Sequence, residues 1–140
     1  MTGDERGDIT VETAIGVTAL FLLLGLGLVG VRVLVADAAI DEAARSAARA
    51  ASIARDGQTA SAAADRRARA VLAEQHLACS SLDVAVDAAD FAKSLGETGY
   101  VVATITCDVP LDELAIPGIS GSKTLRAQFR SPIDRYGARS

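Results

Sequence analysis

The longest uncharged segment lies near the start of the chain, between Glu12 and Arg32. Its residues 13–31 read TAIGVTALFLLLGLGLVGV and show no polar stripe. A helix rises about 1.5 Å per residue, so this segment covers roughly 28 Å, close to the ~30 Å hydrocarbon core of a bilayer. A core helix of a globular protein is usually shorter and keeps a polar face. The pattern therefore predicts one transmembrane helix over about residues 13–31.

The segment after Arg32 is rich in alanine, with nine Ala in residues 36–51. Alanine has the highest helix propensity, and no Gly or Pro interrupts this stretch. We therefore expect the transmembrane helix to continue beyond the membrane through residues 32–57. Gly57 is expected to end it as a left-handed C-terminal cap. The whole helix would then have about 45–48 residues and a length of roughly 70 Å.

The hydrophobic pattern of the remaining residues, 58–140, predicts a small α+β head. A helical period indicates a second helix from about Thr59 to His76. From Leu82 onward the period changes to two, which predicts three half-buried antiparallel strands with one face packed on helices. The apolar positions of the three strands are Leu82, Val84 and Val86; Val101, Ala103, Ile105, Cys107 and Val109; and Leu125, Ala127 and Phe129.

The two cysteines, Cys79 and Cys107, lie on either side of the turn expected between the first two strands. If these strands pair about a turn near residue 93, Cys79 lies opposite Cys107, and this geometry permits a disulfide. A disulfide closing about 28 residues would stabilise the head by roughly 3–4 kcal/mol in the chain-entropy model. Two buried free thiols are the alternative, because free cysteine packs like a small hydrophobe.

Composition narrows the functional classes. The chain has 140 residues, of which 50% are apolar but only 4% aromatic, and it contains no Trp. This length predicts one domain with a modest core. The low aromatic content argues against a large aromatic-lined pocket. The formal net charge of −4 argues against a polyanionic partner, so we expect no nucleic-acid binding.

The polar residues that could carry chemistry are few and scattered. His76 is the single histidine, and the sequence offers no partner at a catalytic spacing, so we interpret it as a surface or helix-cap residue. Asp108, Asp112 and Glu113 lack the spacing of a calcium loop. We therefore expect no catalytic residues, no metal and no cofactor.

Features that bear on membrane topology disagree. Arg6 alone precedes the apolar segment, whereas Arg32, Arg45 and Arg49 follow it, and this distribution favours a cytoplasmic C-terminus. The cysteine pair instead favours an oxidising exterior. A cleaved secretory signal is a further alternative, because residues 36–38 form a small-x-small site. Its apolar part exceeds the usual length of about 7 to 15 residues, and its start is not basic.

The residues just before the apolar segment form a processing motif. The run Arg6-Gly7-Asp8-Ile9-Thr10-Val11-Glu12, followed at once by a long apolar helix, resembles the processing region of type IV prepilins and pseudopilins. With the Ala-rich continuation, which includes Glu42-Ala43-Ala44-Arg45, it is similar in particular to TadE-like minor pseudopilins of tight-adherence (Flp-type) pili. The resemblance covers about residues 6–55.

This resemblance implies a leader peptide, residues 1–7, that a prepilin peptidase removes by cutting after Gly7. The mature membrane segment would then be residues 8–31, with Asp8 as its N-terminus and Glu12 as its fifth residue. In an apolar bundle, the Glu12 carboxylate would neutralise the Asp8 amine of a neighbouring subunit. The implied partners are other pilins or pseudopilins, the peptidase, and an assembly platform with its ATPase. The head would lie outside the cytoplasmic membrane, on a pilus or the cell surface.

Two alternatives from other functional classes remain. The chain could be a single-pass, signal-anchored binding module whose head recognises an extracytoplasmic ligand without assembling. It could also be a secreted protein released by cleavage after Ala38.

Overall fold

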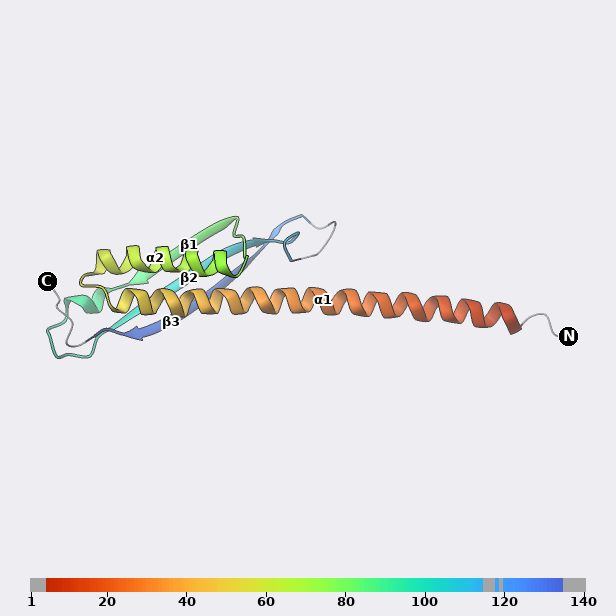
Figure 1. Ribbon diagram of the computed structural model, residues 1–140, viewed down its shortest axis with the longest axis horizontal. Coiled ribbons are helices and arrows are strands. Elements are labelled where there is room, and N and C mark those ends of the chain that lie inside the picture. Colours follow the sequence, from red (N-terminus) through yellow and green to blue (C-terminus); the bar gives the residue numbers. More distant parts are fainter. Residues whose placement is uncertain (1–4, 115–117, 119, 135–140) are drawn as a thin grey trace.

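The computed structural model describes residues 5–114, 118 and 120–134, with residues 5–9 as backbone only. Its elements are α1 (Glu5–Ser52), α2 (Gly57–Glu74), β1 (Ser81–Asp87), the short 3-10 helix η1 (Ala89–Ala92), β2 (Tyr100–Pro110) and β3 (Ser122–Pro132). Helix α1 is a long rod that extends well beyond the head, and the other elements gather along its second half (Figure 1). The α+β class and the order of two helices followed by three strands confirm the sequence prediction.

Helix α1 runs without interruption through 48 residues, as its alanine content predicts. It ends at Ser52, however, and the prediction that Gly57 caps it was wrong. Gly57 is instead the first residue of α2, because the Asp56 carboxylate accepts a hydrogen bond of 2.8 Å from the backbone N–H of Thr59. This is an N-cap, and it lowers the pKa of Asp56 because it stabilises the ionised carboxylate.

Helix α2 ends two residues earlier than expected, in a Schellman motif. His76 adopts the left-handed conformation (φ 54°), and its N–H donates to the carbonyl of Ala73. The N–H of Leu77 donates to the carbonyl of Leu72 at 3.0 Å. These bonds satisfy carbonyls that a helix end would otherwise leave unpaired. His76 is exposed and belongs to the helix cap, as the sequence analysis interpreted it.

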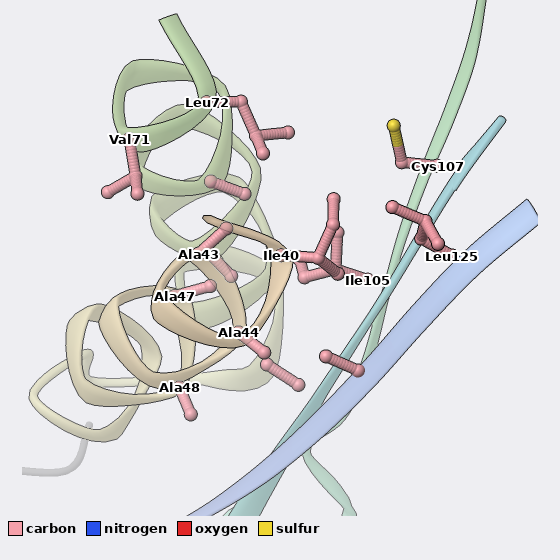
Figure 2. Packing of buried hydrophobic residues seen from close by; sticks show 14 of the residues in the cluster. Ile40, Ala43, Ala44, Ala47, Ala48, Val71, Leu72, Ile105, Cys107 and Leu125 are labelled. Atoms are coloured by element: carbon pink, nitrogen blue, oxygen red, sulfur yellow. The ribbon is translucent and has the colours of Figure 1, made fainter. Parts of the chain in front are cut away.

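The three strands form one antiparallel sheet in the order β1-β2-β3, and both helices cover the same face of it (Figure 2). The core forms where the alanine face of α1 meets α2 and the sheet. Its four central alanines, Ala43, Ala44, Ala47 and Ala48, are at most 1% exposed. Small side chains allow the α1 backbone to lie close to two neighbours at once. The larger side chains come mainly from the sheet, with Ile105 among the most buried, and from Ile40 of α1.

The period-two pattern predicts the buried face of the sheet well in β1 and β2. All five predicted apolar positions of β2 are fully buried, and those of β1 are half-buried. In β3, Leu125 and Ala127 are buried, but Phe129 remains 36% exposed. Strand β3 is an edge strand with no neighbour on its outer side, so the large Phe129 ring is covered only in part.

Candidate functional site

The N-terminal half of α1 presents an apolar surface that the chain itself leaves uncovered. Between Ile15 and Val31 its large apolar side chains are 46–70% exposed, except Val29, which is half-buried. The helix contains an 18-residue window with a mean hydropathy of 2.5, and it is long and apolar enough to cross a membrane. Exposure of this much apolar surface to water would be costly, at about 25 cal/mol per Å². By length and composition this half of α1 is therefore compatible with a single-pass membrane anchor or with a signal sequence.

The polar side chain of Thr18 is accommodated within this apolar stretch. Its hydroxyl donates to the carbonyl of Ala14 at 2.8 Å, one helical turn earlier. A hydroxyl bonded to its own backbone carries a much smaller penalty in lipid than an unsatisfied one. The apolar half of α1 is therefore suited to a bilayer despite this threonine.

Glu12 lies at the start of the apolar half, and its side chain is exposed. Gly16, Ala19 and Gly30 follow it by 4, 7 and 18 residues, spacings that place all four on one face of a helix with 3.6 residues per turn. This Glu12 face, defined by these four residues, thus carries one carboxylate and then small residues. Of these four residues only Glu12 was predicted to be functional from the sequence, although helical spacing alone places all four on one face.

No contact within the described chain requires the glycines of the apolar half. A Cβ atom added at Gly16, Gly25, Gly27 or Gly30 would meet nothing within 4 Å. A glycine inside a helix costs roughly 0.5–1 kcal/mol relative to alanine. In membranes, small residues of this kind let a second helix backbone approach closely. The glycines of the apolar half therefore leave room for close approach of a second helix.

The predicted processing site lies at the very start of α1. The backbone of Gly7 and Asp8 is helical, in the first turn after Glu5. Residues 1–4 of the expected leader lie outside the described residues. The first helical N–H groups have no intrahelical acceptor, so this end of a helix frays readily. A peptidase that needs an extended chain would have to unwind only this first turn.

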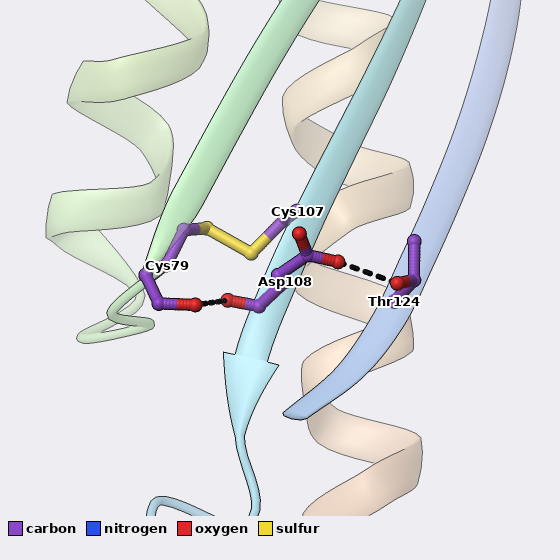
Figure 3. The surroundings of a disulfide bond; sticks show 5 residues. Cys79, Cys107, Asp108 and Thr124 are labelled. Carbon is purple, nitrogen blue, oxygen red and sulfur yellow. Dashed lines mark hydrogen bonds between the residues drawn. A yellow bond between two sulfur atoms is a disulfide. The ribbon is translucent and has the colours of Figure 1, made fainter. Parts of the chain in front are cut away.

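The two cysteines form a disulfide, Cys79–Cys107, with their Cα atoms 5.5 Å apart (Figure 3). The expected strand register was nevertheless wrong, because Leu82, not Cys79, is the residue that pairs with Cys107. The loop that contains η1 moves the centre of the turn to between residues 94 and 95, so the register differs by three residues. Cys79 lies before β1 and reaches Cys107 from the side.

Hydrogen bonds beside the disulfide hold the same corner of the head (Figure 3). The backbone N–H and the hydroxyl of Ser80 both donate to the carbonyl of Asp108, at 2.8 and 2.9 Å. The Asp108 carboxylate accepts a hydrogen bond from the Thr124 hydroxyl. The disulfide and these bonds together join the segment after α2 to β2 and β3.

The other polar residues considered from the sequence do not converge. Asp108 is engaged with Thr124, whereas Asp112 and Glu113 are exposed on the following turn. Among the described residues, no group of three or more His, Cys, Asp or Glu side chains is placed to hold a metal ion. The apolar half of α1 is therefore the strongest candidate for a functional surface.

Comparison with known proteins adds no relative, since no protein-family model, curated protein or solved structure matches this chain.

The disulfide predicts how the head responds to reduction. Reduction should lower the free energy of unfolding by about 3–4 kcal/mol, because the unfolded chain regains the freedom of the closed loop. Urea unfolding of the full chain in detergent micelles, with and without reductant, measures this change. A variant carrying both Cys79→Ala and Cys107→Ala is the control, and it should show no response to reductant. Equal stability of the oxidised and reduced wild-type protein would contradict the prediction.

Proposed function

We propose that this protein is a minor pilin or pseudopilin-like subunit that is held in the membrane by its apolar half-helix and joins a pilus-type assembly by helix packing. The observation that carries the proposal is the Glu12 face, on which a carboxylate and small residues lie exposed and the two glycines contact no side chain of the described residues. The resemblance of residues 6–55 to TadE-like pseudopilins supports the same function.

The chemistry of the Glu12 face suits a helical bundle better than a lone anchor. Between apolar helices in lipid there is little hydrophobic gain, so association depends on close packing and on polar pairs. Gly16, Ala19 and Gly30 permit close packing. The Glu12 carboxylate requires a cation when it enters an apolar bundle, and the amine created at Asp8 of a neighbour supplies one. This pair would set the axial offset between subunits.

The continuity of α1 gives the assembly a defined geometry. The same helix forms the apolar half and, through buried alanines such as Ala44 and Ala47, the core of the head. The helix has no break between the two halves, so the position of the head follows from the position of the apolar half. Packing the apolar halves into a bundle would therefore place the heads in a regular array around it.

Under this proposal, a prepilin peptidase cuts after Gly7, and an assembly platform with its ATPase extracts the subunit and adds it to other pilins or pseudopilins. The head lies outside the cytoplasmic membrane, where the Cys79–Cys107 disulfide forms in an oxidising compartment.

The N-terminus of the mature protein tests the processing step directly. We expect N-terminal sequencing or mass spectrometry of protein from producing cells to find Asp8 as the first residue. An N-terminus at Met1 or Thr2 would instead support a signal-anchored binding module. An N-terminus at Ala39 would show that the protein is secreted, and either result would overturn the proposed function.

Substitutions of Glu12 test its role in assembly. Glu12→Gln keeps the size of the side chain but removes the charge, and it should reduce incorporation into pili at least tenfold, the effect of roughly 1.4 kcal/mol lost from one paired charge. Membrane insertion should be unchanged. Glu12→Asp retains a carboxylate and should assemble more efficiently than Glu12→Gln. Incorporation of Glu12→Gln at the wild-type level, measured by immunoblotting of sheared pili, would remove this role.

Two glycine substitutions test which face of α1 packs against a neighbour. Gly30 lies on the Glu12 face, whereas Gly25 lies more than a third of a turn away from it. Among the described residues nothing lies within 4 Å of a Cβ added at either position, so neither substitution should disturb the fold. Gly30→Leu should block close helix approach and reduce incorporation about tenfold or more, whereas Gly25→Leu should have a much smaller effect. Equal effects of the two substitutions would exclude the Glu12 face as the contact.

A further inference from the structure

The face of the sheet that the helices leave open carries charges of opposite sign on its two edge strands. The pairing registers place residues of the three strands in level rows across this face. One row is Asp83, Thr106 and Arg126, and another is Asp87, Val102 and Arg130. Each row thus has an aspartate on β1 and an arginine on β3. We call these the acidic edge (Asp83, Asp87) and the basic edge (Arg126, Arg130).

A neutral row separates the two charged rows. It consists of Ala85, Thr104 and Gln128. Because the rows are shared by all three strands, the two aspartates have the same spacing along β1 as the two arginines have along β3. The acidic and basic edges therefore carry opposite charges at the same positions along the strands.

The charges of the two edges are not paired with each other within the chain. Strands β1 and β3 lie about 10 Å apart across β2. In the part of the chain that the structure describes, no ion pair joins Asp83 or Asp87 to Arg126 or Arg130. The Arg130 guanidinium stacks on the Tyr100 ring, 3.7 Å from its centre, which holds it on the open face. Stacking leaves the N–H groups at the rim of a guanidinium able to bind a carboxylate.

We propose that the acidic edge of one head binds the basic edge of a second copy of this chain, side by side in the same membrane. Asp83 and Asp87 of one copy would pair with Arg126 and Arg130 of the next. Strands β1 and β3 run in the same direction, because each is antiparallel to β2. A neighbour shifted along the rows without rotation therefore brings β3 beside β1 in a parallel orientation, with the matched rows facing each other. Two copies anchored by the same apolar half-helix in one bilayer share the orientation that this contact requires.

A face-to-face dimer would also bring opposite charges together, but the central strand disfavours it. In that arrangement β2 would face its own copy, and the Asp108 carboxylate on the open face would meet a second Asp108. Like charges placed directly opposite are destabilising. In the side-by-side arrangement Asp108 keeps its hydrogen bond from Thr124 and faces no copy of itself. A side-by-side contact joins two different surfaces, so it continues from copy to copy instead of closing as a dimer.

Exposed ion pairs contribute little each, so the contact should be weak between free heads and effective between anchored ones. Confinement to a membrane raises the concentration of one head near another, as a linker does for two tethered sites. The contact needs neither cleavage after Gly7 nor the Glu12 carboxylate, and it can be tested apart from pilus assembly.

Site-directed crosslinking of the full chain in lipid vesicles tests the contact. Ala85→Cys and Gln128→Cys, both in the neutral row, are made in separate copies with different tags, so that all four edge charges remain. A short bismaleimide should join the two variants in a mixed sample. Neither variant alone should crosslink to itself. Thr104→Cys on the central strand should not crosslink, and efficient Thr104→Cys dimers would overturn the side-by-side arrangement in favour of the face-to-face one.

Charge reversal tests whether the edges cause the association. Adding Asp83→Lys and Asp87→Lys to both crosslinking variants should lower the yield of mixed crosslinks about tenfold, since each attractive pair becomes repulsive. Adding Arg126→Glu and Arg130→Glu as well should restore it. The matched control, Asp41→Lys with Glu42→Lys on α1, makes the same change in net charge away from the sheet and should leave the yield unchanged. A yield insensitive to the edge reversal, or absence of the mixed crosslink in the wild-type background, would refute the proposal.

Discussion

The alanine face of α1 packs closely against α2 and the sheet, and this contact builds the core of the head. A three-stranded sheet and one short helix bury little surface by themselves, and the second half of α1 supplies the missing layer. Because Ala43, Ala44, Ala47 and Ala48 are small and fully buried, the helix backbone itself becomes part of the core. The same helix continues without a break into the exposed apolar half, so the head and the apolar half share one helix.

Specific local bonds hold the other elements on this layer. The Asp56 cap starts α2 immediately after the turn that ends α1, and the Schellman motif around His76 stops it where the chain must cross to the sheet. The disulfide then ties that crossing to β2. Each of these bonds fixes one end of α2, and together they place the helix on β1 and leave the opposite face of the sheet open.

Small residues have different consequences in the two halves of α1. In the head, every alanine of the packing face has a neighbour in the same chain. In the apolar half, Gly16 and Gly30 have the same close-packing capacity, but a Cβ atom added at either would contact none of the residues that the structure describes. This contrast is the physical basis of the proposed bundle, with Glu12 as its polar contact. The open face of the sheet is a second surface proposed for contact with another copy. Its two edge strands carry opposite charges in the same rows.

Local patterns in the sequence are enough to predict the long helix and the central strand. Uninterrupted apolar and alanine runs indicate the long helix, and strict alternation indicates β2, because burial follows the period of the backbone. The positions of Cys79 and Cys107 also permitted the disulfide that the structure contains. Other features follow only from the three-dimensional structure, because a residue could serve either of two elements or because residues far apart in the sequence must come together. Gly57 could end one helix or begin the next, and the Asp56 carboxylate decided in favour of the second. The strand register depends on a loop without periodicity, and it alone places Asp83 level with Arg126.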